Sequence, residues 1–344
     1  MPATVNLLSS LFASLEQESN GRTRRAAADC MRIFVAVTDY EWFQVHASRQ
    51  AVDEVNFWLP SADQGFQALS PGEPLLFKLH SPNNYIAGGG FFTKFVRLPL
   101  SLAWEAFGEG NGVRTLEQAR ERISKYRRTP IRPNEDPSIG CVILAEPFLF
   151  PRDLWIPIPS DFSLNIVRGK GYTTDEYSGE HLWREVTERL AQCSPHRFDK
   201  TTETSAIVDG ARFGNVISVR PRLGQGAFRV LVTDAYDRRC AFTRERTLPV
   251  LEAAHIKPYS SGGRHELTNG LLLRSDLHRL FDLGYVTIDP TAKKVVVSRR
   301  IKEEFENGRD YYALHGRALS DPRDPAAMPS HENLIFHAQT VFLQ

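Results

Sequence analysis

Three polar residues within residues 236–290 have the types and spacing needed to hydrolyse a phosphodiester: His255, Asn269 and His278. The imidazole of His255, with an ordinary pKa of about 6.5, can take a proton from water near neutral pH. His278 and Asp282 are four residues apart, so on a helix they share one face and could bind one divalent ion. Asn269 could tie a loop with its side-chain amide and so orient His255. Together these groups could supply a base, an ion site and a rigid loop.

The surrounding residues predict the elements that hold these side chains. An apolar run after Pro249 predicts a short strand that ends at His255, and a Ser/Gly cluster predicts a loop after it. A second strand and a short helix are expected to follow. The elements are expected at residues 250–254 (strand), 260–263 (loop), 269–270 (turn), 271–273 (strand) and 276–282 (helix), with Ser275 as N-cap and Gly284 as the stop. One histidine thus ends a strand and the other lies on the helix.

This stretch resembles the HNH nucleases, whose ββα-metal fold carries a motif named for the residues that match His255, Asn269 and His278. The phrases AAHIKPY and NGLLLRSDLHRLFDLG are similar to the subgroup found in bacterial restriction-type enzymes. The resemblance implies that His255 is the general base, that Asn269 orients the loop and that His278 binds the metal. It further implies DNA as the substrate and Mg²⁺ or Mn²⁺ as the cofactor.

Two positions depart from the pattern of that family. Many HNH proteins carry an Asp or His ligand directly before the base, where this chain has Ala254. The metal ligands must then come from His278, with Asp282, Asn269 and water as further candidates; for Asp282, an exposed carboxylate at the helix end is the alternative. Many HNH domains also bind a structural zinc through CxxC pairs. Here Cys240 is followed by Ala, Phe and Thr, so a structural zinc is not expected.

Composition indicates an ordinary globular protein. The chain has 344 residues, 42% of them hydrophobic and 24% charged, which is enough for two or three domains. No apolar stretch approaches the ~18 residues of a membrane span, and four scattered cysteines indicate a cytoplasmic protein. The net charge is +1, but residues 201–300 hold 16 Lys and Arg against 10 Asp and Glu, a local excess of +6. The segment with the motif is therefore basic, as expected of a surface that contacts DNA, although such an excess is also common on solvated surfaces.

The N-terminal half predicts a second domain with a curved, aromatic-rich sheet. Strand-like runs at 31–37 and 75–79, the segment FWLP and the phrase PGEPLLFKLHSPNNYIAGGGFF carry this prediction. The order resembles the barrel-like PUA superfamily, particularly EVE and YTH-type domains. Members of that superfamily often bind a modified or flipped base in an aromatic cage. The resemblance implies cage candidates, with burial in the core as the alternative for each aromatic: Trp42, Phe57, Trp58 and Asn83.

The expected fold class is α+β, with a PUA-like curved β-barrel or sheet domain joined to a C-terminal ββα-metal nuclease domain. An apolar helical pattern at 5–17 is consistent with a packing helix or with a homodimer contact. Three arginines near the nuclease segment are candidates for contacts with the DNA backbone: Arg220, Arg222 and Arg229. The expected division is an N-terminal helix (1–29), the PUA-like domain (30–165), a helical connector (166–200), the nuclease domain (201–320) and a tail (321–344).

These observations predict a metal-dependent endonuclease that restricts foreign DNA carrying modified bases. Two other functions stay open at this point. Ala254 is compatible with a nucleic-acid-binding module whose HNH fold is degenerate. A structure-specific repair nuclease would carry the same motif but would prefer DNA junctions to modified duplexes.

Overall fold

The computed structural model describes residues 30–49, 52–63, 65–127, 130–132, 134–193 and 223–344. The helix expected at 5–17, Arg220 and Arg222 lie outside the described residues. The chain divides into two compact units that are not consecutive in sequence. Unit 1 is Met1–Gln50, Gly65–Lys94 and Glu146–Pro221, and unit 2 is Ala51–Gln64, Phe95–Ala145 and Arg222–Gln344. The linear division expected from the sequence therefore stays a prediction.

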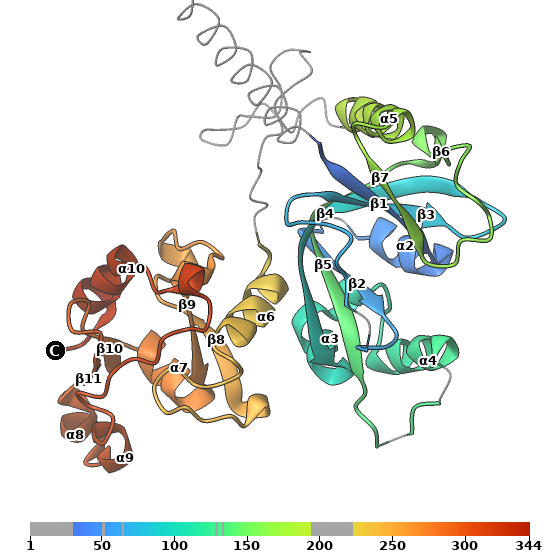
Figure 1. Ribbon diagram of the computed structural model, residues 1–344. Helices are drawn as coiled ribbons and strands as arrows, with labels where there is room; N and C mark the ends of the chain where they lie inside the picture. The colour runs from blue at the N-terminus through green and yellow to red at the C-terminus, as the bar shows by residue number, and fades with distance from the viewer. Residues whose placement is uncertain (1–29, 50–51, 64, 128–129, 133, 194–222) are drawn as a thin grey trace, which may run out of the picture. The chain divides into compact units, whose positions relative to one another are not determined.

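A seven-stranded mixed sheet has the order β2-β5-β4-β3-β1-β7, with β6 paired to β4 (Figure 1). Strands β1 and β3 are parallel, whereas β1–β7, β2–β5, β3–β4 and β4–β6 are antiparallel. Because β2 and β7 are edge strands, the described strands form an open sheet and not a closed barrel. The bounds are β1 (Arg32–Thr38), β2 (Glu54–Leu59), β3 (Pro74–Leu79), β4 (Tyr85–Pro99), β5 (Ser138–Leu149), β6 (Ile156–Pro157) and β7 (Gly169–Thr173). The α+β class predicted from the sequence is confirmed.

Unit 1 builds its core on β1 and β3. All six residues of β3 are buried, as expected for a strand covered on both faces. Helices α2 (Tyr40–Ala47) and α5 (Tyr177–Cys193) belong to this unit, and Leu182 and Val186 of α5 pack in the same apolar cluster as Ile33 and Val35. Strand β7 and helix α5 lie where the sequence predicted a helical connector, and β7 extends the sheet beside β1.

The first part of unit 2 packs α3 (Leu100–Phe107), η1 (Gly108–Asn111) and α4 (Leu116–Tyr126) with α6 (Gln225–Ala235). Helix α6 is mostly apolar, so most of its surface is buried. Its first turn is fixed by Glu54, whose carboxylate oxygens accept hydrogen bonds from the backbone amides of Gly226 (2.7 Å) and Ala227 (2.9 Å). An acidic group at this end of a helix is favourable because the free amides there carry positive partial charge. Helix α6 is thereby held in place to present Phe228 to the candidate site.

The segment over residues 248–282 has the predicted order of strand, loop, strand and helix. It comprises η3 (Leu248–Val250), β8 (Leu251–His255), η4 (Tyr259–Ser261), η5 (Leu267–Asn269), β9 (Gly270–Arg274) and α7 (Ser275–Asp282). Two expectations were wrong: Gly270 is the first residue of β9 and not part of a turn, and Ser275 is the first helical residue and not the N-cap. The β8–β9 ladder runs as far as Arg274, whose extended backbone makes it the N-cap residue. The Arg274 guanidinium pairs with the Asp276 carboxylate at 2.5 Å and 3.0 Å across the start of α7.

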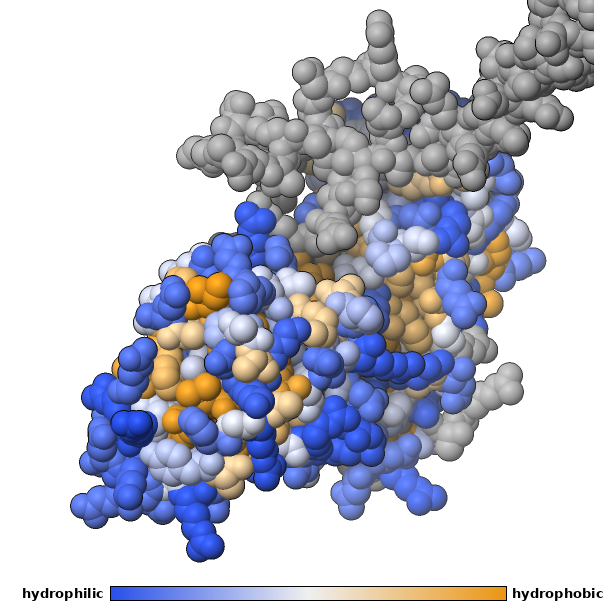
Figure 2. All heavy atoms as spheres, turned by 60° about the vertical axis from the view of Figure 1, so that its left-hand side comes forward, coloured by the Kyte–Doolittle hydropathy of each residue, from blue (hydrophilic) through white to orange (hydrophobic). Residues whose placement is uncertain are grey.

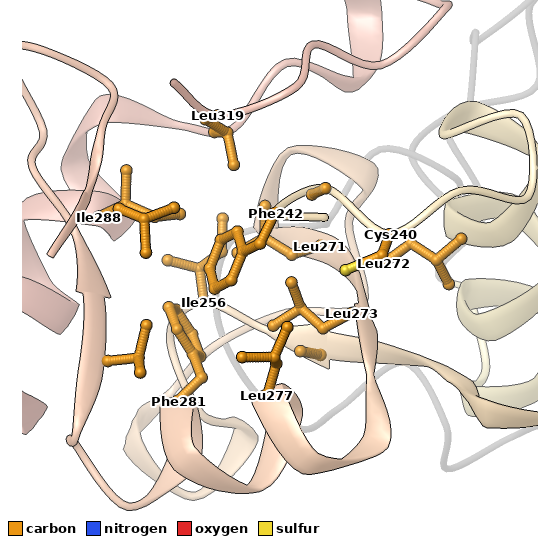
Figure 3. Packing of buried hydrophobic residues seen from close by; sticks show 14 of the residues in the cluster. Cys240, Phe242, Ile256, Leu271, Leu272, Leu273, Leu277, Phe281, Ile288 and Leu319 are labelled. Carbon is orange, nitrogen blue, oxygen red and sulfur yellow. The ribbon is translucent and has the colours of Figure 1, made fainter. Parts of the chain in front are cut away.

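An apolar cluster sets the orientation of α7. Figure 3 shows Leu277 and Phe281 of α7 extending into the same cluster as Ile256 and residues 271–273 of β9. All these side chains are fully buried. Because residues 277 and 281 face inward, residues 278 and 282 lie on the neighbouring, more exposed side of the helix.

The C-terminal residues pack onto α7. After β10 (Val286–Ile288) and β11 (Val295–Val297) come α8 (Arg300–Phe305), α9 (Arg309–Tyr312), α10 (His331–Phe336) and η7 (His337–Val341). The His337 ring stacks on Phe281 with centroids 3.7 Å apart and hydrogen-bonds to Thr287 at 2.8 Å. In Figure 2, hydrophilic residues cover most of the visible face, with smaller apolar areas among them. No helix in the described ranges is long and apolar enough to cross a membrane.

Candidate active site

His255 ends β8 in a half-buried position beneath α6. Its ring stacks on Phe228, with centroids 4.0 Å apart and planes at 11°. Its ladder partner is Gly270, where an added Cβ would lie 2.4 Å from a side chain of α6, so glycine is needed for this close packing. Burial, together with the smaller effects of the charges of His265 and His278, lowers the pKa of His255 to about 4. At neutral pH the imidazole is therefore uncharged and has the lone pair that a general base needs.

His265 contacts the base directly. Its Nδ1 lies 2.9 Å from Nε2 of His255, and its ring stacks on Tyr259 with centroids 4.9 Å apart and planes at 16°. Burial lowers the pKa of His265, and the negative charge of Asp53 opposes this effect. The sequence analysis did not identify His265. The only signal for it was a histidine in the loop shortly before Asn269.

Asn269 ties the loop that follows the base, and its side chain is buried. Its Oδ1 accepts a hydrogen bond from the Lys257 amide at 2.8 Å, and its Nδ2 donates to the carbonyls of Lys257 and Arg264, both at 3.0 Å. The loop folds so tightly that a Cβ at Gly263 would lie 1.9 Å from the Lys257 carbonyl oxygen. The amide is thus committed to backbone groups on both sides of the loop, and its catalytic importance stays a prediction.

His278 lies between two carboxylates. Its Nδ1 is 2.7 Å from Oε2 of Glu252 on β8, and its Nε2 is 3.3 Å from Oδ2 of Asp282. When the Nδ1–H of His278 donates a hydrogen bond to Glu252, the free lone pair of the ring is on Nε2, which faces Asp282. Burial raises the pKa of Asp282, and the charges of His278 and Arg279 oppose that shift. Glu252 was also missed by the sequence analysis; its signal is an acidic residue three positions before His255.

The donors around His278 fit a sparsely ligated divalent ion. Within the described part of the chain, no three His, Cys, Asp or Glu side chains are arranged as a metal site. Nε2 of His278 and Oδ2 of Asp282 are two adjacent donors, and Mg²⁺ usually keeps several waters and binds only one or two protein carboxylates. Ala254 is fully buried in the apolar cluster, so that position faces the core. Cys240 is buried in the same cluster.

The four residues predicted to form a base cage do not all lie in one unit. Trp42 and Asn83 belong to unit 1, and Phe57 and Trp58 belong to unit 2. Trp42 is only 4% exposed and packs against Phe77 at 5.0 Å between ring centroids. That these four residues form one base-binding cage stays a prediction.

Unit 1 carries an accessible aromatic cluster that the sequence analysis did not identify. Tyr40 and Tyr85 are 39% and 43% exposed, and both lie beside Trp155, at centroid distances of 6.4 Å and 6.3 Å. The guanidinium of Arg152 lies 5.7 Å from the Trp155 ring centroid. Aromatic faces next to an arginine are the groups on which nucleic-acid bases stack.

Arg229 is the only one of the three predicted arginines within the described residues. Its guanidinium forms an ion pair with Glu105 at 2.9 Å, and both side chains are partly exposed. An exposed pair of this kind is weak, so Arg229 could exchange Glu105 for a phosphate. Its contact with DNA stays a prediction.

Comparison with known proteins identifies the site segment. Residues 240–289, which include β8, β9 and α7, match the family model described as HNH endonuclease, and this confirms the predicted resemblance. A mutant of the ASCH protein from Zymomonas mobilis shares 8% identity over 45% of this chain and 97% of that chain, with a TM-score of 0.31. The modification-dependent TagI restriction endonuclease shares 12% identity over 86% of this chain and 79% of that chain, with a TM-score of 0.26. The comparison with curated proteins found no match.

Proposed function

We propose that this chain is a metal-dependent endonuclease that hydrolyses DNA and is directed to modified DNA by unit 1. One observation carries the catalytic part. A histidine that is neutral at pH 7 ends β8, within the segment that matches HNH endonucleases, and His278 of the same segment is paired with Asp282. This is a base together with a divalent-ion site.

Each residue of the site has a role in the proposed steps of hydrolysis. His255 takes a proton from water, the hydroxide so formed bonds to phosphorus, and the P–O bond to the leaving oxygen breaks. That oxygen then takes a proton from solvent. Phe228 holds the imidazole plane by stacking, and Asn269 keeps the loop beside the base rigid. A divalent ion held by His278 and Asp282 would supply stabilisation of the negative charge that develops on the phosphate.

The cluster of Tyr40, Tyr85 and Trp155 supports a role of unit 1 in binding bases. Each base that stacks on an aromatic ring contributes about 1–3 kcal/mol to the binding free energy, whichever of the bases it is. A modified base flipped out of the duplex could stack here. Trp42 belongs to the same unit and is buried against Phe77.

A binding module with a degenerate nuclease fold is the main competing function, and Ala254 was the reason to consider it. The burial of Ala254 in the core and the contacts of His278 with Glu252 and Asp282 support an intact site. An alanine at residue 254 therefore leaves these polar groups in place.

The test is digestion of a panel of modified and unmodified phage DNAs and of branched junctions by the purified chain. The proposal expects cleavage with Mg²⁺ or Mn²⁺, none with EDTA, and faster cleavage of some modified DNAs. His278→Ala should reduce cleavage, whereas Asn307→Ala, at an exposed position, should not. Binding without cleavage under every ion would favour the degenerate module, and a preference for junctions would favour a repair nuclease.

A further inference from the structure

We propose that His265 is a positioning residue for catalysis: it accepts the Nε2–H of His255 and thereby leaves Nδ1 of His255 as the nitrogen that takes the proton from water. This inference rests on the proposed nuclease function. It starts from the 2.9 Å contact between Nε2 of His255 and Nδ1 of His265.

The contact allows only one useful arrangement of protons. Two neutral imidazoles share one hydrogen, so one nitrogen donates and the other accepts. If His265 donated, Nδ1 of His255 would have to carry the proton, and neither nitrogen of His255 could act as a base. If His255 donates, Nδ1 of His255 has the lone pair. Only the second arrangement permits general-base catalysis.

Nδ1 of His255 has no hydrogen-bond partner among the described residues, and the His255 side chain is only half-buried. The nitrogen that the pair leaves free is therefore the one that can reach a water molecule.

The surroundings hold the pair in this geometry. Phe228 stacks on the His255 ring and Tyr259 stacks on the His265 ring, so each plane is fixed by an aromatic neighbour. The charged or titratable groups that act on the pair are His278 on α7 and Asp53, which precedes β2. Burial lowers the pKa of His265 and outweighs the opposing charge of Asp53, so His265 is neutral at pH 7 and its Nδ1 can accept a hydrogen bond.

The same hydrogen bond also stabilises the product of proton transfer. When Nδ1 has taken a proton, His255 is positively charged, and its Nε2–H becomes a stronger donor to His265. The bond is present before proton transfer and strengthens as the charge develops, so losing it together with the Nε2–H tautomer that it fixes should lower the rate by about 10- to 100-fold. The loss of this acceptor should therefore appear in kcat and not in DNA binding.

Two substitutions separate this role from simple packing. His265→Leu keeps much of the volume but removes the acceptor, and it should lower kcat by about 10- to 100-fold. His265→Asn should restore most of the rate, because its Oδ1 can take the place of Nδ1. Asn307→Ala, at an exposed position away from the pair, is the control and should cut at the wild-type rate. KM should stay unchanged throughout.

A second readout does not need activity. In the full chain with ¹⁵N-labelled histidine, NMR at pH 7 should show His255 protonated at Nε2 only, with a nitrogen–nitrogen coupling across the hydrogen bond to Nδ1 of His265. The His255 signals are assigned by their absence in His255→Ala. The coupling should disappear in His265→Leu.

The two proposals fail in different ways. A wild-type chain that cuts no DNA overturns the nuclease function, while the NMR result still decides the role of His265. A proton on Nδ1 of His255 overturns the inference. Cleavage by His265→Leu at the wild-type rate, or the same low rate in His265→Asn, overturns it as well.

Discussion

Asn269→Ala should loosen the loop beside the catalytic base. The side chain makes three hydrogen bonds, at 2.8 Å, 3.0 Å and 3.0 Å, and all of them go to backbone groups of Lys257 and Arg264. Each contributes about 1 kcal/mol to stability, so the substitution should cost roughly 3 kcal/mol. At about 1.4 kcal/mol per tenfold change, local opening of the loop should increase on the order of 100-fold.

Amide hydrogen exchange measures this effect where it occurs. The Lys257 amide should exchange on the order of 100-fold faster in Asn269→Ala than in the wild type, if opening is local. Asn269→Asp should not rescue the loop, because a carboxylate keeps the acceptor for the Lys257 amide but cannot donate to the two carbonyls. Asn307→Ala, at an exposed position, is the control. Unchanged exchange at Lys257 in Asn269→Ala would refute the assignment of Asn269 as the tie of this loop.

Three further expectations follow from other contacts. Glu252→Gln should weaken Mn²⁺ binding about 10- to 100-fold in calorimetric titration, because Glu252 orients His278 through Nδ1; unchanged affinity would contradict this role. Burial lowers the pKa of His46 to about 3 and that of His337 to about 4, so the unfolded chain binds more protons than the folded one below a pH of about 6.5. Stability should therefore be complete above that pH and should fall as the pH drops towards 4. His46→Phe should reduce the loss of Tm between pH 7 and pH 4.5, since neither nitrogen of His46 has a hydrogen-bond partner; an unchanged loss would contradict this. Tyr85→Ala, at the most exposed ring of the cluster, should reduce binding of modified DNA by about 10-fold, the equivalent of one stacked base; equal binding by the variant would count against the aromatic cluster.

The local part of the site was predictable from sequence. A strand ending at His255 and a helix ending at Asp282 depend on neighbouring residues, and the structure has both. The turn expected at 269–270 lies earlier, as η5 (Leu267–Asn269), because Gly270 already pairs with His255 in the strand ladder. The error at Ser275 arose because the β8–β9 ladder reaches Arg274 and leaves no room for a cap one residue later. Tertiary pairing decided that boundary.

The contacts that tune the site were not predictable in the same way. His265 reaches His255 only because Asn269 folds the intervening loop, and Phe228 reaches it from a helix packed against β9. Sequence spacing carries no signal for either contact. Sequence spacing likewise gives no signal that Glu252 contacts His278, which is 26 residues later in the chain.

In unit 1, the sequence showed that aromatic residues were abundant but not which ones were buried. Trp42 lies on α2 with Phe43 and His46 on its inner face, whereas Tyr40 remains accessible. The partner of Tyr40, Trp155, is more than a hundred residues away in the chain. Only the fold brings these two rings together.

Single-turnover cleavage by purified His255→Ala, compared with the wild type, tests the central claim most directly. The neutral imidazole at the end of β8 is assigned as the general base, and loss of such a base typically lowers the rate by about 10²–10⁴-fold. The variant should still bind DNA and Mn²⁺, because neither Asp282 nor His278 is changed. A loss of that size with binding retained is the predicted result. Cleavage by His255→Ala at the wild-type rate would contradict the account.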